Sequence, residues 1–231
     1  TEISFQIMIK ENFLNINCAI DEAAKKYGKE KDGITLVAVS KKHSIEKIKE
    51  AFSLGQRDFG ENFVQEAVNK IITLNNTEII WHFIGHIQSN KTRQISEHFN
   101  WVHTVDRIKI AERLSKHRPR YADDLNICIQ VNVDFEDSKS GVSYKDLMDL
   151  CHAIKDLPRI KLRGLMCIPK IRFEHEMQRK PFNTIKNLLV DLNENDFDMD
   201  TLSMGMTDDF KAAIQEGSTI IRIGTALFGS R

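Results

Sequence analysis

Short apolar runs alternate with longer amphipathic segments along most of the chain. The apolar runs are as short as buried strands, and the segments between them repeat apolar residues at the spacing of a helix face. This alternation predicts strands at residues 35–40, 57–59, 79–84, 101–104, 126–132, 161–166, 201–203 and 219–223. It predicts helices near residues 44–54, 62–74, 89–98, 106–117, 143–155, 181–193 and 208–216. Ser143, with an acidic residue three positions later, is a suitable cap for the helix that follows it.

Strands that alternate with helices form parallel β-α-β units. Eight such strands without a linker favour a single-domain (β/α)8 TIM barrel over residues 1–231, although the pattern alone also permits a doubly wound open sheet. Residues 1–28 precede the first strand as an extra helix that ends at Gly28. Only eight residues follow the last strand, too few for a full outer helix. Because the first and last strands of a closed barrel are neighbours, we expect the N-terminal helix to cover that gap.

Charge and cysteine content narrow the class of protein. The chain has 33 Lys and Arg residues against 33 Asp and Glu residues and no basic block, which makes nucleic acid a poor candidate partner. Its four cysteines are scattered, without a Cys/His cluster at metal-binding spacing, as is typical of a reducing compartment. No apolar run approaches the roughly 20 residues that cross a bilayer. The composition therefore predicts a cytoplasmic protein with no membrane partner and no metal.

Lys41 follows the first predicted strand, LVAVS, almost directly. In a TIM barrel the active site lies at the carboxyl ends of the strands, so this amine is expected at the site. Burial favours the neutral form of a lysine, and a neutral amine can form a Schiff base with a carbonyl compound. The alternative is a surface lysine that extends into solvent from a strand end. Strand alternation turns the next residue, Lys42, toward the rim.

The loops after the last two strands are candidates for binding phosphate. Gly224 and Thr225 follow the eighth strand, and Ser203 and Met204 end the seventh. TIM barrels often hold a phosphate group between these two loops. Thr207 is expected to open a helix whose N-terminus adds positive potential. Taken singly, each loop is equally well explained as an ordinary strand-to-helix turn.

Arg222 lies inside an apolar run, IIRIG, where a guanidinium is costly unless it is paired or stacked. One explanation is an ion pair with a carboxylate in the barrel. The other is a hydrogen bond to the ring nitrogen of pyridoxal phosphate, which would bring an aldehyde to Lys41 and a phosphate to the two loops. A permanent cation at that nitrogen disfavours its protonation and weakens the cofactor as an electron sink.

Eight motifs in order identify a family. The chain contains AVSKK, FGENFVQE, WHFIGHIQSNK, VHTVDR, QVNVDFEDSKSGV, LRGLMCIP, LSMGMTDDFKAAIQEGST and IRIGTALFG. Together they resemble the YggS/PROSC family, whose members are known as pyridoxal phosphate homeostasis proteins. The resemblance covers nearly the whole chain. It implies a barrel like the N-terminal domain of alanine racemase, called fold type III, that binds pyridoxal phosphate as a Schiff base.

The resemblance also implies roles for individual residues. The lysine that holds the cofactor falls on Lys41, and the arginine that faces the ring nitrogen falls on Arg222. The family lysine of the SKSG motif falls on Lys139, with an expected role near the cofactor or in its exchange. The positions implied to bind the phosphate are Ser203, Met204, Gly224 and Thr225, and those implied to line the ring are Asn62, Ile84 and Gly85.

Three departures from the family pattern stand out. SKKHS replaces the usual residues after the first strand, so Lys42 and His43 alter the rim. Phe63 stands where the family often has tyrosine, which removes a hydroxyl. The segment 170–181 matches nothing in the family pattern and is expected to be a loop.

Three functions are compatible with a lysine and a phosphate site. A racemase needs a second base on the opposite face of the cofactor, and none of the three tyrosines falls at a strand end. A Schiff-base aldolase usually carries its lysine on a middle strand beside acids. A protein that stores, buffers or delivers pyridoxal phosphate, with little or no turnover and no catalytic residue, fits best; a PLP-dependent racemase-like enzyme is the alternative. We expect a monomer whose partners, besides the cofactor, include PLP-dependent apo-enzymes.

Other polar residues are expected to have unremarkable roles. His103 alternates with apolar neighbours and is predicted to be a satisfied core histidine. His82 and His86 lie on a strand and its exit, where helical metal-ligand geometry does not apply. Glu61 and Asp137 lie at strand ends and are predicted to be solvated on the rim.

Overall fold

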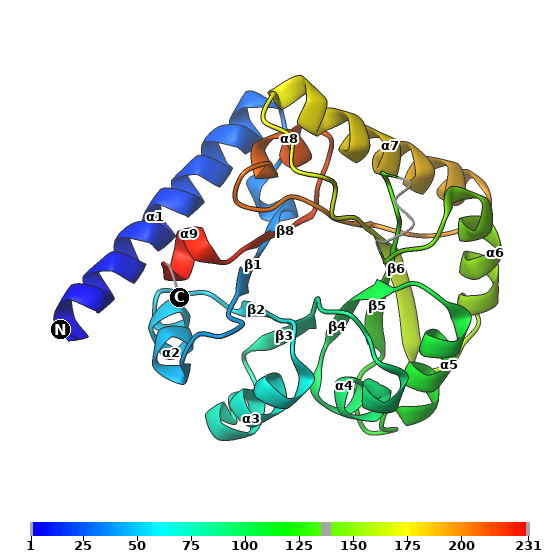
Figure 1. Ribbon diagram of the computed structural model, residues 1–231, viewed down its shortest axis with the longest axis horizontal. Helices are drawn as coiled ribbons and strands as arrows, with labels where there is room; N and C mark the ends of the chain where they lie inside the picture. The colour runs from blue at the N-terminus through cyan, green and yellow to red at the C-terminus, as the bar shows by residue number, and fades with distance from the viewer. Residues whose placement is uncertain (1, 135–139, 230–231) are drawn as a thin grey trace.

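The computed structural model describes residues 2–134 and 140–229, and eight parallel strands in it close into a barrel in chain order (Figure 1). Strand β1 pairs with β8, with Val37 opposite Arg222, and this pairing excludes the open sheet. The strands are β1 (Thr35–Val39), β2 (Asp58–Glu61), β3 (Ile80–Phe83), β4 (Trp101–Val105), β5 (Leu125–Gln130), β6 (Ile160–Met166), β7 (Thr201–Ser203) and β8 (Ile220–Ile223). The predicted barrel is therefore confirmed.

Helices surround the barrel and bury their apolar faces against it. In α5, for example, Ile110, Ala111 and Leu114 are completely buried. Ser143 caps α6 as predicted, because its hydroxyl oxygen accepts a hydrogen bond from the Asp146 backbone N–H at 3.3 Å. The helices are α1 (Glu2–Lys26), α2 (Ile45–Ser53), α3 (Val64–Leu74), α4 (Thr92–His98), α5 (Ile108–His117), α6 (Tyr144–Ile154), α7 (His175–Glu194), α8 (Phe210–Gln215) and α9 (Thr225–Phe228), with short 3-10 turns at Lys31–Gly33 and Ser89–Lys91.

Helix α1 completes the outer ring beside the short helix α9 that follows β8. Figure 1 shows it lying beside α9, and it also packs against α2 and α8. Ile9, Ile16 and Ile20 on its inner face are buried. The amide of Asn12 donates a hydrogen bond to the Leu227 carbonyl at 3.1 Å. The expected role of the N-terminal helix is confirmed.

The expectation of a loop over residues 170–181 is wrong for its second half, because α7 begins at His175. Proline favours the first turn of a helix, and the predicted helix began at residue 181. That proline instead lies inside the helix and is buried. A tertiary contact holds the added turns: Arg179 Nε donates to the buried carboxylate of Glu216 at 2.7 Å.

None of the helices in residues 2–134 and 140–229 is both long and apolar enough to cross a membrane.

Candidate functional site

The backbone on both sides of Lys41 is held by one helix. The ammonium of Lys70, on α3, donates a hydrogen bond to the Ser40 carbonyl at 2.8 Å. The backbone N–H of Lys42 donates to the Glu66 carboxylate, also on α3, at 2.6 Å. Lys42 adopts a left-handed conformation, with φ of 61°, which sharply turns the chain after β1. Lys41 is half-buried at this turn, and Lys42 is exposed on the rim as predicted.

These contacts belong to a buried ionic cluster made by Glu61, Lys70 and Glu66. Lys70 lies 2.8 Å from Glu61 Oε1 and 2.6 Å from Glu66 Oε1. The Ser40 hydroxyl donates to Glu61 Oε1 at 2.6 Å. Burial raises the pKa of Glu61, and the neighbouring Lys70 acts in the opposite direction. The cluster thus ties the ends of β1 and β2 to α3.

Glu61 is therefore not the solvated rim residue that we predicted, since it is completely buried. The sequence did contain a signal for the cluster. Glu66 and Lys70 are four residues apart on α3, the spacing of an ion pair on one helix face. Because Lys70 is only 6% exposed, its charge requires a second carboxylate, and Glu61 supplies it. Asp137, the other acid predicted for the rim, lies outside the described residues.

Arg222 is buried in the barrel interior, and burial lowers its pKa. Its Nη1 donates a hydrogen bond to the Ser203 hydroxyl at 2.6 Å, and its Nη2 donates to the Cys167 carbonyl at 3.0 Å. Within the described part of the chain, these bonds link Arg222 to neutral oxygens and to no carboxylate. The guanidinium stays charged at any physiological pH, so its environment solvates it with dipoles.

The predicted phosphate residues at the end of β7 already have partners. Besides Arg222, the Ser203 hydroxyl bonds His103, and the Met204 backbone N–H donates to the Ile220 carbonyl at 3.0 Å. The side chain of Met204 is completely buried. Thr207 does not begin a helix as predicted, since α8 begins at Phe210. The Asp209 carboxylate accepts a hydrogen bond from the Met206 backbone N–H at 2.6 Å and holds the intervening residues in a turn. A phosphate-binding role for Ser203 and Met204 stays a prediction.

Gly224 and Thr225 begin the short helix α9 beside the end of β1. Gly224 takes the N-cap position, and Thr225 is exposed. A Cβ atom on Gly224 would lie 3.2 Å from the Val39 carbonyl oxygen, so β8 approaches β1 closely here. The first backbone N–H groups of any helix lack partners within it. Lys41 follows Val39 by only two residues, which places it close to the loop of Gly224 and Thr225.

Asn62, Ile84 and Gly85 adjoin one another where β2 and β3 end. A Cβ atom on Gly85 would lie only 2.1 Å from the Asn62 carbonyl oxygen, which makes glycine necessary there. The Thr104 hydroxyl donates to the Gly85 carbonyl at 2.6 Å. Ile84 is buried, and its N–H donates to the Glu61 carbonyl at 2.9 Å. The buried Oδ1 of Asn62 accepts no hydrogen bond from the described residues, so it can bind a ligand.

Two departures from the family pattern, Lys42 and Phe63, lie against each other. The Lys42 ammonium lies 5.9 Å from the centre of the half-exposed Phe63 ring. His43 packs against Phe228, with ring centres 5.0 Å apart. A cation beside an exposed aromatic ring contributes about 0.5–1 kcal/mol. Phe63 thus has a packing role that needs no hydroxyl.

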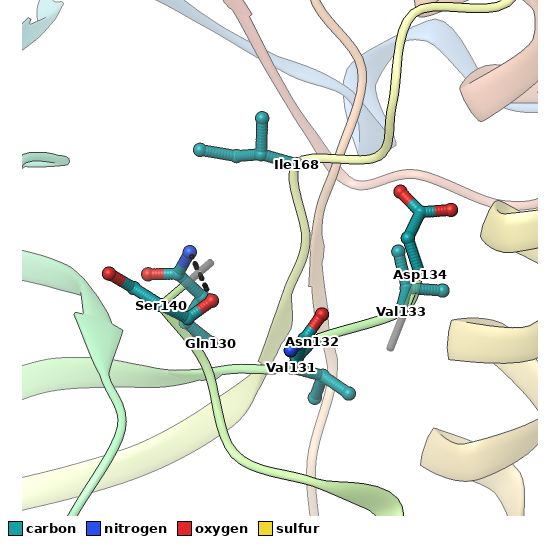
Figure 2. Close-up of a pocket in the computed structure, with 7 residues that line it drawn as sticks. All are labelled: Gln130, Val131, Asn132, Val133, Asp134, Ser140 and Ile168. Carbon is teal, nitrogen blue, oxygen red and sulfur yellow. Dashed lines mark hydrogen bonds between the residues drawn. The ribbon is translucent and has the colours of Figure 1, made fainter. Parts of the chain in front are cut away.

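A cavity of about 240 Å³ opens at the ends of β5 and β6 (Figure 2). Gln130 Nε2 donates to the Ser140 carbonyl at 3.3 Å across it, as the dashed line in Figure 2 shows. The predicted site residues at the ends of β1, β2, β3, β7 and β8 do not line this cavity. Lys139, the remaining one, lies outside the described residues. The cavity is lined by Gln130, Val131, Asn132, Val133, Asp134, Ser140 and Ile168.

Residues 2–134 and 140–229 contain no group of three or more His, Cys, Asp or Glu side chains that could hold a metal ion. Two of the histidines considered from the sequence, His82 and His103, instead bond each other at 2.9 Å inside the barrel. His103 is completely buried with a partner on each ring nitrogen, as expected of a satisfied core histidine.

Comparison with known proteins gives the family. Residues 19–231 match the family described as alanine racemase, N-terminal domain. A pyridoxal phosphate homeostasis protein of Pseudomonas aeruginosa is 52% identical over 223 residues, which cover 96% of each chain. The chain belongs to the family of pyridoxal phosphate homeostasis proteins. Another member of this family, from Escherichia coli, is 46% identical over 226 residues, 96% of this chain and 97% of its own.

Solved structures support the assignment of the chain to this family. PipY of Synechococcus elongatus, determined with PLP bound, is 35% identical and has a TM-score of 0.80, covering 91% of this chain and 100% of its own. Alanine racemase of Corynebacterium glutamicum is 13% identical with a TM-score of 0.70, covering 98% of this chain and 61% of its own. The likeness to the racemase concerns the barrel fold alone.

Proposed function

We propose that this protein binds pyridoxal phosphate and serves its homeostasis, as a store, buffer or carrier with little or no turnover. The observation that carries the proposal is the fixed, half-buried Lys41 at the end of β1, in a chain 52% identical to a pyridoxal phosphate homeostasis protein. A lysine held by hydrogen bonds on both sides has a defined direction, which a covalent attachment site requires.

The residues at the end of the barrel fit this cofactor. The Lys41 amine would hold the cofactor covalently, by condensing with its aldehyde group with loss of water. Asn62 offers a buried amide oxygen without a partner among the described residues, beside the close backbone approach at Gly85. Ile84 and Gly85 line the ring. Gly224 and Thr225 would hold the phosphate, and Ser203 and Met204, whose hydroxyl and backbone N–H have protein partners, would lie beside it.

Arg222 determines which chemistry the bound cofactor performs. Pyridoxal phosphate acts as an electron sink when its ring nitrogen carries a proton. Arg222 is a permanent cation in a buried position, so its presence at that nitrogen opposes protonation. This favours holding the cofactor over carbanion chemistry. For Lys139 we propose a role near the cofactor or in its exchange.

The positions and partners of the three tyrosines argue against a racemase. Tyr121 is 92% exposed, and the Tyr27 hydroxyl is 3.3 Å from His175 on the outer helices. Tyr144 donates to the Val133 carbonyl at 3.2 Å, and burial raises its pKa to about 12, so the hydroxyl stays protonated and cannot serve as the second base. We therefore propose a non-enzymatic protein, monomeric and cytoplasmic, that passes its cofactor to apo-enzymes.

The first experiment is an absorption spectrum of the purified protein with added pyridoxal phosphate, followed by borohydride reduction and peptide mass spectrometry. We expect a visible band and a reduced adduct on Lys41. The variant Lys41→Ala loses both, while the matched variant Lys42→Ala keeps both. No band, or an adduct spread over surface lysines, would overturn the proposal.

A second experiment separates carrier from racemase. The loaded protein is incubated with L-alanine or L-serine in D2O, and exchange of the Cα hydrogen is followed by NMR. The carrier proposal expects no exchange above that of free pyridoxal phosphate at the same concentration. Exchange that is faster, and that disappears in Lys41→Ala, would identify a racemase-like enzyme instead.

A further inference from the structure

A continuous hydrogen-bonded chain crosses the barrel interior and ends on Arg222. It begins at Asp58, the first residue of β2, whose Oδ1 lies 2.9 Å from His82 Nε2 on β3. His82 Nδ1 lies 2.9 Å from His103 Nε2 on β4. His103 Nδ1 lies 2.7 Å from the Ser203 hydroxyl on β7, which accepts from Arg222 on β8 at 2.6 Å. Five strands thus contribute one side chain each.

With both histidines neutral, the donors and acceptors of this chain are satisfied in one direction. An ionised Asp58 only accepts, so His82 carries its proton on Nε2 and accepts through Nδ1. His103 must then donate from Nε2 and accept through Nδ1. The Ser203 hydroxyl therefore gives its proton to His103, and its oxygen remains as the acceptor for Arg222. Both histidines are neutral Nε2–H tautomers in this assignment, which follows from the hydrogen-bond network.

The surroundings support a neutral His103. Burial, aided by the nearby Arg222 cation, holds the pKa of His103 well below its ordinary value of 6.5. A protonated His103 would carry a proton on Nδ1 and could no longer accept from Ser203. The polarised chain instead joins the Arg222 cation to the Asp58 carboxylate through three neutral groups. The carboxylate whose charge acts on Arg222 is Asp209, so Asp58 is linked to Arg222 only through these hydrogen bonds.

We propose that Asp58, His82 and His103 are positioning residues that hold Arg222 in its place at the cofactor. They do so by fixing the direction of the Ser203 hydroxyl, and this inference rests on the proposed function. Without an acceptor at His103, the hydroxyl is free to turn its proton toward Arg222, and the guanidinium loses one of its two protein hydrogen bonds. The far end of the barrel, at the start of β2, thereby affects the binding site at the opposite end.

The first test needs no cofactor. Long-range 15N–1H correlation spectra of the free protein report the protonation state of each histidine ring, with His82→Gln and His103→Gln used for assignment. We expect both histidines as neutral Nε2–H tautomers at neutral pH. An Nδ1–H tautomer or a protonated ring at either position would overturn the inference, whatever the protein binds.

The second test measures the bound cofactor in His103→Leu and Asp58→Asn, with Asp32→Asn as the control. Asp32 is an exposed acid at the same end of the barrel as Asp58, and it does not belong to the hydrogen-bonded chain. We expect His103→Leu to raise the Kd for pyridoxal phosphate about tenfold and to shift its absorption band. Asp58→Asn shifts the band in the same direction with a smaller rise in Kd.

The outcomes separate the inference from the function. If the parent protein binds no pyridoxal phosphate, the proposed function fails. The tautomer measurement still tests whether the hydrogen bonds from Asp58 to Arg222 have the proposed direction. If the parent binds it and both variants match Asp32→Asn in Kd and in band position, the inference is wrong. Asp58→Asn keeps the measurement possible if His103→Leu does not fold, since Asp58 lies at the barrel edge with a side chain 21% exposed.

Discussion

Replacing Lys70 by methionine removes the one cation of the cluster that holds Lys41 in place. The methionine keeps the length and apolar stem of the lysine, so the change removes charge and hydrogen bonds more than volume. Glu61 then retains only the Ser40 hydroxyl as a partner for its buried Oε1, and its Oε2 has no partner among the described residues even in the parent protein. The Ser40 carbonyl loses the Lys70 ammonium as a donor and keeps the His43 backbone N–H.

The expected loss of stability is large because one buried charge is left without its partner. Breaking a buried ion pair from one side costs about 3–5 kcal/mol. The unfolding entropy of a 231-residue chain, about 0.5 kcal/mol/K, converts this cost to a fall in Tm of about 6–10 °C. The double variant Lys70→Met with Glu61→Gln removes the orphaned charge, so it recovers part of the loss.

The cost also depends on pH, with a sign that can be worked out. In Lys70→Met, burial without a counter-ion raises the folded-state pKa of Glu61 further above its unfolded value near 4.5. The folded state then binds the proton more tightly than the unfolded state does. The penalty is therefore largest at neutral pH and shrinks by about 1.4 kcal/mol per pH unit as the pH falls toward 4.5.

Urea unfolding of both variants between about pH 5 and pH 8 measures these quantities. The exposed lysine of α2 serves as the control, and Lys49→Met is expected to change stability by less than about 0.5 kcal/mol. A penalty for Lys70→Met below about 1 kcal/mol, or one that does not vary with pH, refutes the reasoning. The variant is also expected to bind pyridoxal phosphate more weakly, because the backbone beside Lys41 is no longer fixed.

Three further predictions test other parts of the structure. Gly85→Ala brings a Cβ atom to 2.1 Å from the Asn62 carbonyl oxygen, so we expect a loss of about 3 kcal/mol in urea unfolding. Ser143→Ala removes a helix cap and costs about 1 kcal/mol by the same assay. The hydrogen bonds from Arg163 lower the pKa of Asp200 below its ordinary 3.8. That stabilisation is present above pH 3.8 and is lost as the pH falls through the folded-state pKa. We therefore expect the free energy of unfolding of Asp200→Asn to be lower than that of the parent at neutral pH, by under about 1 kcal/mol at this exposed site, and to match it in acid.

The barrel could be predicted from the sequence because its strands are buried on both faces. Such strands are near-continuous apolar runs, and each is followed by an amphipathic helix. The strand at residues 201–203 was predicted with its observed bounds. The start of α7 was missed because a proline in a helix interior contradicts local preference, and the contact between Arg179 and Glu216 that favours the longer helix joins residues far apart in the sequence.

The candidate site was only partly predictable, for the same reason. Lys41 could be recognised because a strand end and its neighbours are local features of the sequence. Glu61 could not be recognised as buried, because its burial depends on a lysine nine residues later that reaches back from α3. His103 was predicted to be an ordinary core histidine, and His82 was given no role beyond lying on a strand. Their shared role becomes visible only when the barrel closes and brings β3, β4 and β7 around one interior.

Arg222 shows how the two explanations offered from its sequence can be combined. An ion pair and a bond to the ring nitrogen were alternatives, because one guanidinium was assumed to have one partner. A guanidinium has five N–H donors. Two bonds hold it to Ser203 and to the Cys167 carbonyl, and its other donors bond no described residue. Its charge interacts at a distance with the Asp209 carboxylate, and Ser203 links it to Asp58 through two histidines. A guanidinium held by two neutral oxygens keeps donors for a ligand, which a direct ion pair with a carboxylate would have occupied.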